Sequence, residues 1–248
     1  MFAGRIVERR DRIAACCLIS TILSAGILIS LGLEGILCCL AAIPLMALPM
    51  MLGACAGANS RSASGGCANT AVLLICPLLL TAADFAERPF RSACTERFDS
   101  SMWLPCTPER AWSLVVEMDA MRGDRPFLMS LGLPEPRRCI LDRHAAGGQR
   151  VCYFDDGRIV QVITDWQPAR SLELRITENT LPGRKWLTFL DAGYTFTAEN
   201  GGTRLTRHTR ISSAVFPRWY WRPLERWGVT SEHEYIFSHL ARAAAGTD

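Results

Sequence analysis

His233 is the residue whose type and position point most directly to chemistry in this sequence. It lies on an apolar stripe in the segment Trp219–Ala245, where apolar residues recur at a spacing close to 3.6 residues. The stripe consists of Val229, His233, Ile236, Phe237, Leu240 and Ala244. A histidine that faces a cavity from such a helix acts as a general acid or base, or fixes the polar head of a ligand. The alternative is a core histidine whose hydrogen bonds are satisfied.

Arg207 is the second candidate, because it falls on the more apolar side of a strand. In Thr203–Ile211 the two-residue period of a strand puts Leu205, Arg207 and Thr209 on one face, which we interpret as the cavity face. The opposite face carries Arg204, Thr206, His208 and Arg210. An inward arginine is costly unless it pairs with a carboxylate or an anionic ligand. An arginine at the mouth of a cavity would instead extend its charged head to water.

Aromatic side chains supply the candidates for an apolar pocket. The four cavity candidates are Phe154, Trp166, Trp186 and Tyr194. Core packing alone accounts for part of this set, because aromatic residues bury large apolar surfaces. A second aromatic group, interleaved with arginines, comprises Trp219, Tyr220, Trp221 and Trp227 among Arg218, Arg222 and Arg226. Such a mixture suits either a membrane interface or a helix start with a charged outer face.

The motifs of the common enzyme and metal sites are absent from the sequence. It has no nucleophile elbow, Walker loop or GxGxxG fingerprint, and no C-x-x-C occurs among its 11 cysteines. Asp155 and Asp156 are adjacent turn residues that point different ways, so they do not form an acid–base pair. A net charge of +3 without a basic run argues against nucleic-acid binding. We therefore expect no metal, no cofactor and no catalytic residue, and the sequence leaves open whether the protein is an enzyme.

The elements that must position these residues are a run of strands and one long helix. Strands are predicted over Thr95–Leu104, Arg138–Asp142, Gln149–Phe154, Arg158–Trp166, Ser171–Thr177, Phe189–Ala198 and Thr203–Ile211. Two short helices, one starting at Thr107-Pro108-Glu109 and one around Phe127–Leu131, precede the second strand. The last helix, Trp219–Ala245, is predicted to be interrupted at Pro223 and Gly228. The fold class is α+β, a curved antiparallel sheet wrapped around the C-terminal helix with a cavity between them.

Four short motifs occur in a fixed order along these elements. They are P-E-R-A-W (Pro108–Trp112), F-D-D-G (Phe154–Gly157), D-W-x-P (Asp165–Pro168) and G-G-T-R-L (Gly201–Leu205). Together with the layout, they resemble the START-like helix-grip superfamily of polyketide cyclase/dehydrase-like and lipid-transfer domains, over about residues 95–245. L-E-G-I-L-C (Leu33–Cys38) resembles the N-terminal part of uncharacterised bacterial membrane-anchored members. The resemblance implies a ligand cavity but no particular chemistry.

The first third of the chain is predicted to be a membrane segment. From Ile13 to Ala58 the chain is apolar with Glu34 as its sole charge, and only a bilayer solvates such a run. Residues 1–84 are predicted to hold about three transmembrane helices, over 13–33, 36–58 and 67–83. A linker over 85–94 and the helix-grip domain over 95–245 follow. A cleaved signal peptide is the alternative for the first span, although its apolar stretch exceeds the usual length.

The orientation follows from arginines that precede the first span. Arg5, Arg9, Arg10 and Arg12 keep that end in the cytoplasm under the positive-inside rule. With three spans, the protein is a multi-pass protein of the inner (cytoplasmic) membrane whose C-terminal domain is extracytoplasmic. A third segment lying along the surface would leave that domain in the cytoplasm.

The redox state of two cysteines in the C-terminal domain depends on this compartment. Cys139 and Cys152 flank a predicted turn at Ala145–Gly148 and face each other across a hairpin. They form either a disulfide, in an oxidising compartment, or two unpaired core thiols. We expect two unpaired core thiols.

Three functions are compatible with these features. The leading hypothesis is membrane-anchored binding or transfer of a lipid or other hydrophobic small molecule in the cavity between sheet and helix. Its partners would be the lipid bilayer and that ligand. The second is a cyclase- or hydrolase-like enzyme that uses His233 with Arg207 in the same cavity. The third is a non-catalytic membrane-assembly or regulatory protein whose spans bind a partner.

Overall fold

The computed structural model describes residues 94–216 and 218–246, together with a few isolated residues between positions 15 and 44. The chain divides into two compact units, Met1–Ser92 and Ala93–Asp248. The spans predicted over 13–33, 36–58 and 67–83, and the linker over 85–94, lie almost wholly outside the described residues. Within the described part of the chain, no helix is long and apolar enough to cross a membrane.

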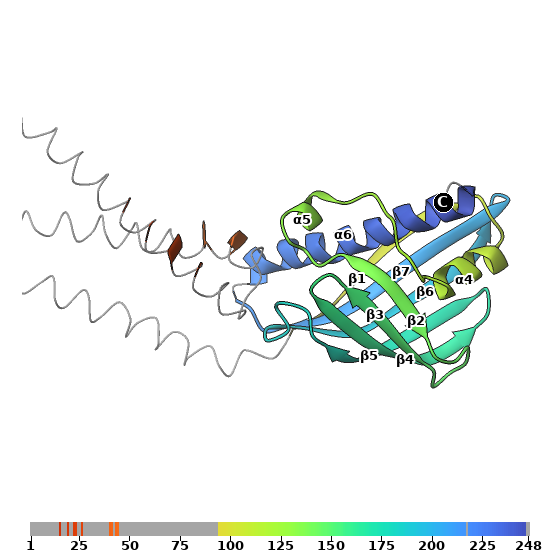
Figure 1. Ribbon diagram of the computed structural model, residues 1–248, viewed down its shortest axis with the longest axis horizontal. Coiled ribbons are helices and arrows are strands. Elements are labelled where there is room, and N and C mark those ends of the chain that lie inside the picture. The colour runs from red at the N-terminus through yellow and green to blue at the C-terminus, as the bar shows by residue number, and fades with distance from the viewer. Residues whose placement is uncertain are drawn as a thin grey trace, which may run out of the picture. The chain divides into compact units, whose positions relative to one another are not determined.

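One curved, seven-stranded antiparallel sheet forms the body of the second unit (Figure 1). Its strands are β1 (Cys94–Leu104), β2 (Pro136–Leu141), β3 (Gln149–Phe154), β4 (Gly157–Gln167), β5 (Ser171–Asn179), β6 (Leu187–Glu199) and β7 (Gly202–Ser213). The spatial order is β1-β7-β6-β5-β4-β3-β2, so consecutive strands from β2 to β7 are neighbours and β1 closes onto β7. All seven predicted strands are confirmed. They were predictable because a strand with one buried face has a two-residue period of apolar side chains.

Two short helices lie between β1 and β2 in the sequence, as predicted. In α4 (Pro108–Val116), the Thr107 side chain accepts a hydrogen bond from the backbone nitrogen of Arg110 at 3.4 Å, which caps the helix start. The second helix, α5 (Phe127–Ser130), is a single turn.

The terminal helix α6 (Arg218–Ala245) is continuous, so the interruptions predicted at Pro223 and Gly228 were wrong. Pro223 lies in the second turn, on an exposed side of the helix, where the proline removes one backbone hydrogen bond. Trp221, Glu225 and Val229 are buried before and after that position. Burial of one face therefore outweighs the two unfavourable helix residues.

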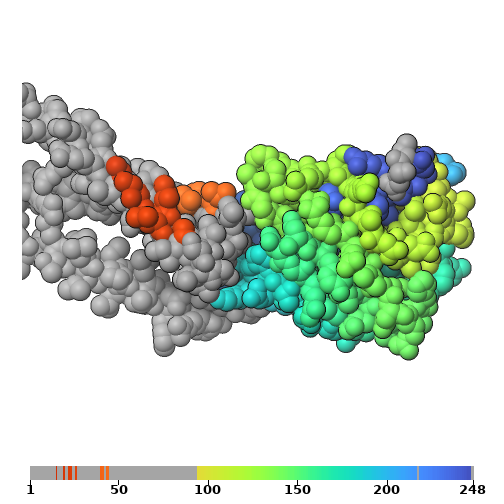
Figure 2. Space-filling view, in the orientation of Figure 1, coloured from red at the N-terminus to blue at the C-terminus, as the bar shows by residue number. Residues whose placement is uncertain are grey.

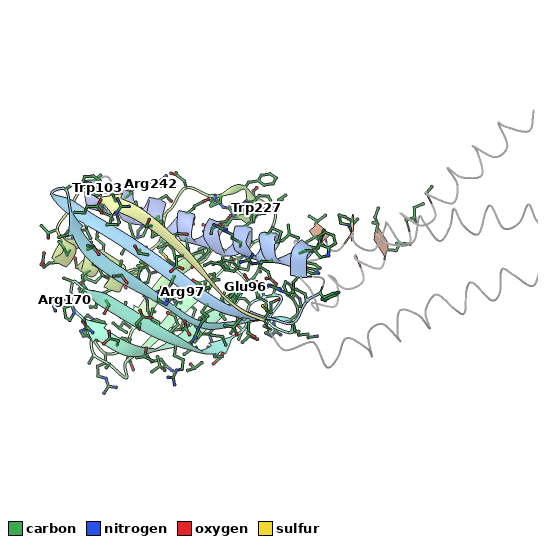
Figure 3. All side chains as sticks on the ribbon, turned by 180° about the vertical axis from the view of Figure 1, so that it is seen from behind. Glu96, Arg97, Trp103, Arg170, Trp227 and Arg242 are labelled. Carbon is green, nitrogen blue, oxygen red and sulfur yellow. A yellow bond between two sulfur atoms is a disulfide. The ribbon has the colours of Figure 1, made fainter. Side chains whose placement is uncertain are left out.

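The helix α6 lies against the inner face of the sheet and packs most closely along β1. In Figure 3, Glu96 lies near the start of α6 and Trp103 near its end, beside Arg242, so β1 follows the helix for most of its length. Figure 2 shows that the segment holding α5 and β2 covers much of α6 on the side that faces the viewer. This arrangement is the helix-grip architecture that the resemblance implied.

The main hydrophobic core lies between the sheet, α4 and α6. It includes Leu104, Ile163, Leu172, Leu174, Phe196 and Leu205 from the strands, and Ile236, Phe237 and Leu240 from α6. A smaller cluster of Phe98, Ile211 and Val229 lies toward the start of α6. The inner face of the sheet thus combines this apolar core with buried polar side chains, among them Arg150, Arg207 and Thr209.

Cys139 and Cys152 form a disulfide between β2 and β3, so the expectation of two unpaired thiols was wrong. The two residues are directly opposite each other in the strand register, with their Cα atoms 4.0 Å apart. Both side chains are buried in the main core. The register decides the pairing, because it brings the two β-carbons to the same face at adjacent positions.

Loss of this disulfide is expected to lower the free energy of unfolding by about 2–3 kcal/mol, because the bond closes a short loop in the unfolded chain. The two cysteines are separated by 13 residues. The measurement is urea unfolding of the full chain, followed by circular dichroism, for the wild type and for a Cys139→Ser/Cys152→Ser variant. The exposed Cys94 provides the control. Cys94→Ser should leave the midpoint unchanged, and equal midpoints for all three proteins would contradict the prediction.

Candidate functional site

The inner face of β7 carries Leu205, Arg207 and Thr209, as strand alternation predicted, and all three are buried. Arg207 is therefore not at a water-filled mouth, since only 8% of its surface is exposed. A buried guanidinium requires partners, because an uncompensated charge in a protein interior costs several kcal/mol.

Arg207 has two partners, one on the helix and one on the neighbouring strand. Its Nη2 donates to both carboxylate oxygens of Glu232 on α6, each at 2.8 Å. Its Nη1 donates to the phenolic oxygen of Tyr194 on β6, and its guanidinium carbon lies 4.9 Å from the centre of that ring. The pair thus joins the sheet to α6 through the apolar core.

Arg150, on β3, is a second buried arginine in this region, with 3% of its surface exposed. Its Nη2 donates to the backbone oxygen of Val115 at 3.0 Å and approaches the sulfur of Met118 at 3.4 Å. Its Nε is buried without a hydrogen-bond partner. None of the carboxylates among the described residues forms an ion pair with it.

The charges of Arg150, Arg207 and Glu232 influence one another across the core. Burial, followed by the positive charge of Arg207, lowers the pKa of Arg150 to about 10, while Glu232 opposes the shift. Burial raises the pKa of Glu232 above its usual value, and Arg207 and Arg150 act against that rise. Two guanidinium groups therefore lie near one carboxylate, which pairs only with Arg207, and the three groups carry a net positive charge.

His233 is completely buried on α6, next to Glu232 in the sequence. Its Nε2 shares a hydrogen bond with the hydroxyl of Thr209, and its Nδ1 shares one with Ser100, both at 2.9 Å. Burial, with the charge of Arg207 as a lesser cause, lowers the pKa of His233 to about 2. The imidazole is therefore neutral, and both of its nitrogens are already occupied by neighbouring hydroxyls.

The four aromatic candidates do not form one pocket. Tyr194 is buried in the main core, and Phe154 and Trp166 are partly buried against that core. The Trp166 ring lies 4.8 Å from that of Trp112 in an edge-to-face contact. Trp186 lies elsewhere, before β6, with its ring 6.0 Å from that of Trp221 on α6. The site thus brings together Tyr194, Arg207 and His233, with Trp186 apart from them.

Sequence reasoning missed three polar residues of this region, namely Glu232, Arg150 and Ser100. Glu232 lies three residues after Val229 and four before Ile236, so its position on the inner side of α6 was readable from the helical spacing. Arg150 alternates with Cys152 and Phe154, which signals an inner-face position. Ser100 gave no signal, because a serine in a strand fits either face.

The aromatic and arginine residues at the start of α6 are divided between the interior and the surface. Trp221 is buried, whereas 77% of the Trp219 surface and 47% of the Trp227 surface are exposed. Arg218 and Arg222 both form ion pairs with Glu96 on β1. Those two arginines therefore anchor the helix start to the sheet.

Among the described residues, no group of three or more histidine, cysteine, aspartate or glutamate side chains is placed to hold a metal ion. The arrangement between sheet and helix instead combines an apolar wall with a buried cationic group. Such a combination suits recognition of a ligand that is mostly apolar and carries a polar head.

No protein-family model matches the sequence. No curated protein matches it either. Similar solved structures include Ara h 8.0201, at 14% identity and a TM-score of 0.42, covering 62% of this chain and 99% of that one. A protein of unknown function from Staphylococcus aureus aligns at 10% identity and a TM-score of 0.45, covering 63% and 97%. The Aha1 dimer from Colwellia psychrerythraea aligns at 9% identity and a TM-score of 0.34, covering 59% and 98%.

Proposed function

We propose that the second unit binds a lipid or another hydrophobic small molecule between the sheet and α6. The observation that carries the proposal is the buried Arg207–Glu232 pair, with Tyr194 and Arg150, beside the main hydrophobic core. Replacing a buried ion pair by apolar residues of similar size is often neutral or stabilising. A polar group in such a place is therefore better explained by recognition of a ligand than by stability.

The apolar side chains around this group supply the surface that a hydrophobic ligand needs. Ile163, Leu174, Phe196 and Leu205 come from four different strands of the inner face and belong to one cluster. Ligand sites of this kind are mostly apolar and use a few polar groups to fix orientation. Binding rather than catalysis is favoured, because His233 is neutral and both ring nitrogens are engaged.

Residues 1–84 would hold this domain at the bilayer, with the N-terminus in the cytoplasm and the domain on the extracytoplasmic side. The apolar run from Ile13 to Ala58 supports an anchor in the membrane. The Cys139–Cys152 disulfide supports the extracytoplasmic side, because disulfides persist in oxidising compartments. A domain tethered beside a bilayer meets lipid at a high effective concentration.

Exposed aromatic side chains near the start of α6 support contact with the membrane surface. Phe216 and Trp219 are more than half exposed, and the ring of Phe127 stacks on Trp227 at 6.3 Å. Tryptophan and arginine together are typical of the interfacial region of a bilayer.

A photoreactive neutral probe tests the proposed function. The full chain in phosphatidylcholine nanodiscs is illuminated with a ten-carbon alcohol that carries a diazirine, and labelled peptides are quantified by mass spectrometry. Labelling of the peptides that hold Tyr194, Leu205 and Ile236 should saturate, and excess unmodified decanol should compete with it. Adducts are assigned to single residues by fragmentation, and the exposed Thr164 of β4 and Arg175 of β5 are the internal control. Labelling that rises linearly with probe concentration, or that does not distinguish the two faces, would contradict binding.

A further inference from the structure

Arg150 is the buried charge that the fold itself does not explain. It lies on β3 opposite Gln161 of β4, and 97% of its surface is removed from solvent. Arginine is almost never fully buried unless it is paired. The two acceptors that Arg150 contacts, the Val115 carbonyl and the Met118 thioether, are both uncharged.

A structural role accounts for only part of the Arg150 side chain. Val115 lies in the last turn of α4, where a cation stabilises the free carbonyls of a helix end. This contact uses Nη2 and leaves the buried Nε without a partner. A neutral amide donor would serve the same carbonyl without the cost of a buried charge. The positive charge of Arg150 therefore requires a second explanation.

The neighbouring ion pair does not neutralise Arg150. Glu232 already receives two hydrogen bonds from Arg207 at 2.8 Å, so its carboxylate is committed to that partner. With one carboxylate for two guanidinium groups, the site lacks one negative charge. A ligand with a single negative charge would complete it.

We propose that the ligand of this site carries a monoanionic headgroup, in the simplest case a carboxylate, and that Arg150 binds this headgroup beside the Arg207–Glu232 pair. This inference rests on the proposed function, because it names the class of ligand for the same site. The planar guanidinium matches a carboxylate in a way that a point charge does not. The apolar tail then lies against the main core cluster, where Leu174 and Phe196 are buried.

The test compares two probes that differ only in the headgroup. The full chain in phosphatidylcholine nanodiscs is labelled with a ten-carbon diazirine fatty acid and with the matching diazirine alcohol. In the wild type, the acid should half-saturate the β3 and α6 peptides at a concentration at least tenfold below that of the alcohol. Charge-assisted hydrogen bonds of this kind are worth roughly that factor or more.

Variants of Arg150 then separate its charge from its contact with Val115. Arg150→Gln keeps a donor for the Val115 carbonyl, and Arg150→Met removes it. Both should raise the half-saturating concentration of the acid about tenfold and change that of the alcohol less than twofold. Arg175→Met, at an exposed position on β5, is the matched control and should change neither. If circular dichroism shows that Arg150→Met does not fold, Arg150→Gln and the comparison of acid with alcohol in the wild type still test whether Arg150 binds the headgroup.

Each other outcome has a defined meaning. Equal half-saturation by acid and alcohol in the wild type, or an unchanged acid affinity in Arg150→Gln, would overturn the headgroup assignment while leaving apolar binding in place. Failure of the alcohol to label saturably would overturn the proposed function itself. If free acetate competes as strongly as decanoate, the site binds small anions, and the proposal of a ligand with an apolar tail is refuted.

Discussion

Replacing Glu232 by alanine is expected to lower the free energy of unfolding by about 3–5 kcal/mol, the largest effect of any single substitution proposed for this protein. The carboxylate is the sole counter-charge to Arg207 among the described residues, and the Arg207 side chain is 9% exposed. Without Glu232, two buried guanidinium groups would remain with no negative partner. The loss reflects that uncompensated charge rather than the intrinsic strength of the ion pair.

Urea unfolding of the full chain, followed by circular dichroism, measures the effect of Glu232→Ala. The matched control is Glu178→Ala, because Glu178 pairs with Arg158 at a similar distance of 2.9 Å but at the surface. Exposed pairs contribute about 0.2–1 kcal/mol, so the control should stay within that range. Equal losses in the two variants would mean that the Arg207–Glu232 pair is effectively solvated.

A double variant tests the interpretation of the pair further. Arg207→Met with Glu232→Leu removes both charges and keeps similar side-chain volumes. Its stability should recover most of the loss caused by Glu232→Ala, because buried pairs are often replaceable by apolar residues. Its ligand binding should not recover, since Arg207 and Glu232 are part of the proposed site.

Replacing His233 by alanine is expected to cost about 3–4 kcal/mol of stability, the second-largest effect. The substitution removes two hydrogen bonds, leaves the hydroxyls of Ser100 and Thr209 without their partner, and opens a cavity in a fully buried position. His144→Ala, at an exposed position, is the matched control and should change the stability by less than about 0.5 kcal/mol.

The pH dependence of unfolding distinguishes a core histidine from a catalytic one. The pKa of His233 is about 2 in the folded protein, whereas it is about 6.5 in the unfolded chain. Only the unfolded state takes up a proton as the pH falls below 6.5. The stabilising contribution of the neutral His233 to the free energy of unfolding is therefore complete above that pH and decreases below it. From pH 8 to pH 5 this loss amounts to about 2 kcal/mol, and it should be absent in His233→Ala. A variant that keeps wild-type stability and pH dependence would contradict the core assignment.

Local periodicity explains why most of the architecture was predictable. The two-residue alternation of β7 identified Leu205, Arg207 and Thr209 as inward residues, and the 3.6-residue spacing placed His233 on the inner side of α6. Both patterns depend only on the geometry of one element and on one buried face. The same rule applies to Arg150, which alternates with Cys152, and to Glu232, which lies at helical spacing from Val229 and Ile236.

The interruption predicted in α6 shows where local rules fail. Pro223 and Gly228 both disfavour a helix in isolation, yet the helix continues because Trp221, Glu225 and Val229 bury one side of it. Tertiary packing supplies more free energy than the two residues remove.

The unexpected burial of His208 on the outer face has a similar origin, because Gly193 lies opposite it and leaves room for its ring.

The sequence by itself determined the order of the strands and helices, the inward face of β7 and the apolar character of the first third of the chain. These properties follow from the types of neighbouring residues, so a single segment carries them. The tertiary structure alone decided that Arg207 meets Glu232, that His233 lies between Ser100 and Thr209, and that Cys139 is bonded to Cys152. Each of these contacts joins two different elements; the hairpin pattern placed the two cysteines opposite each other but did not decide whether they bond, and no local pattern placed α6 against β1 and β7. The burial of Arg150 is likewise a property of the tertiary structure, because its Nη2 donates to the Val115 carbonyl at the end of a different element, α4.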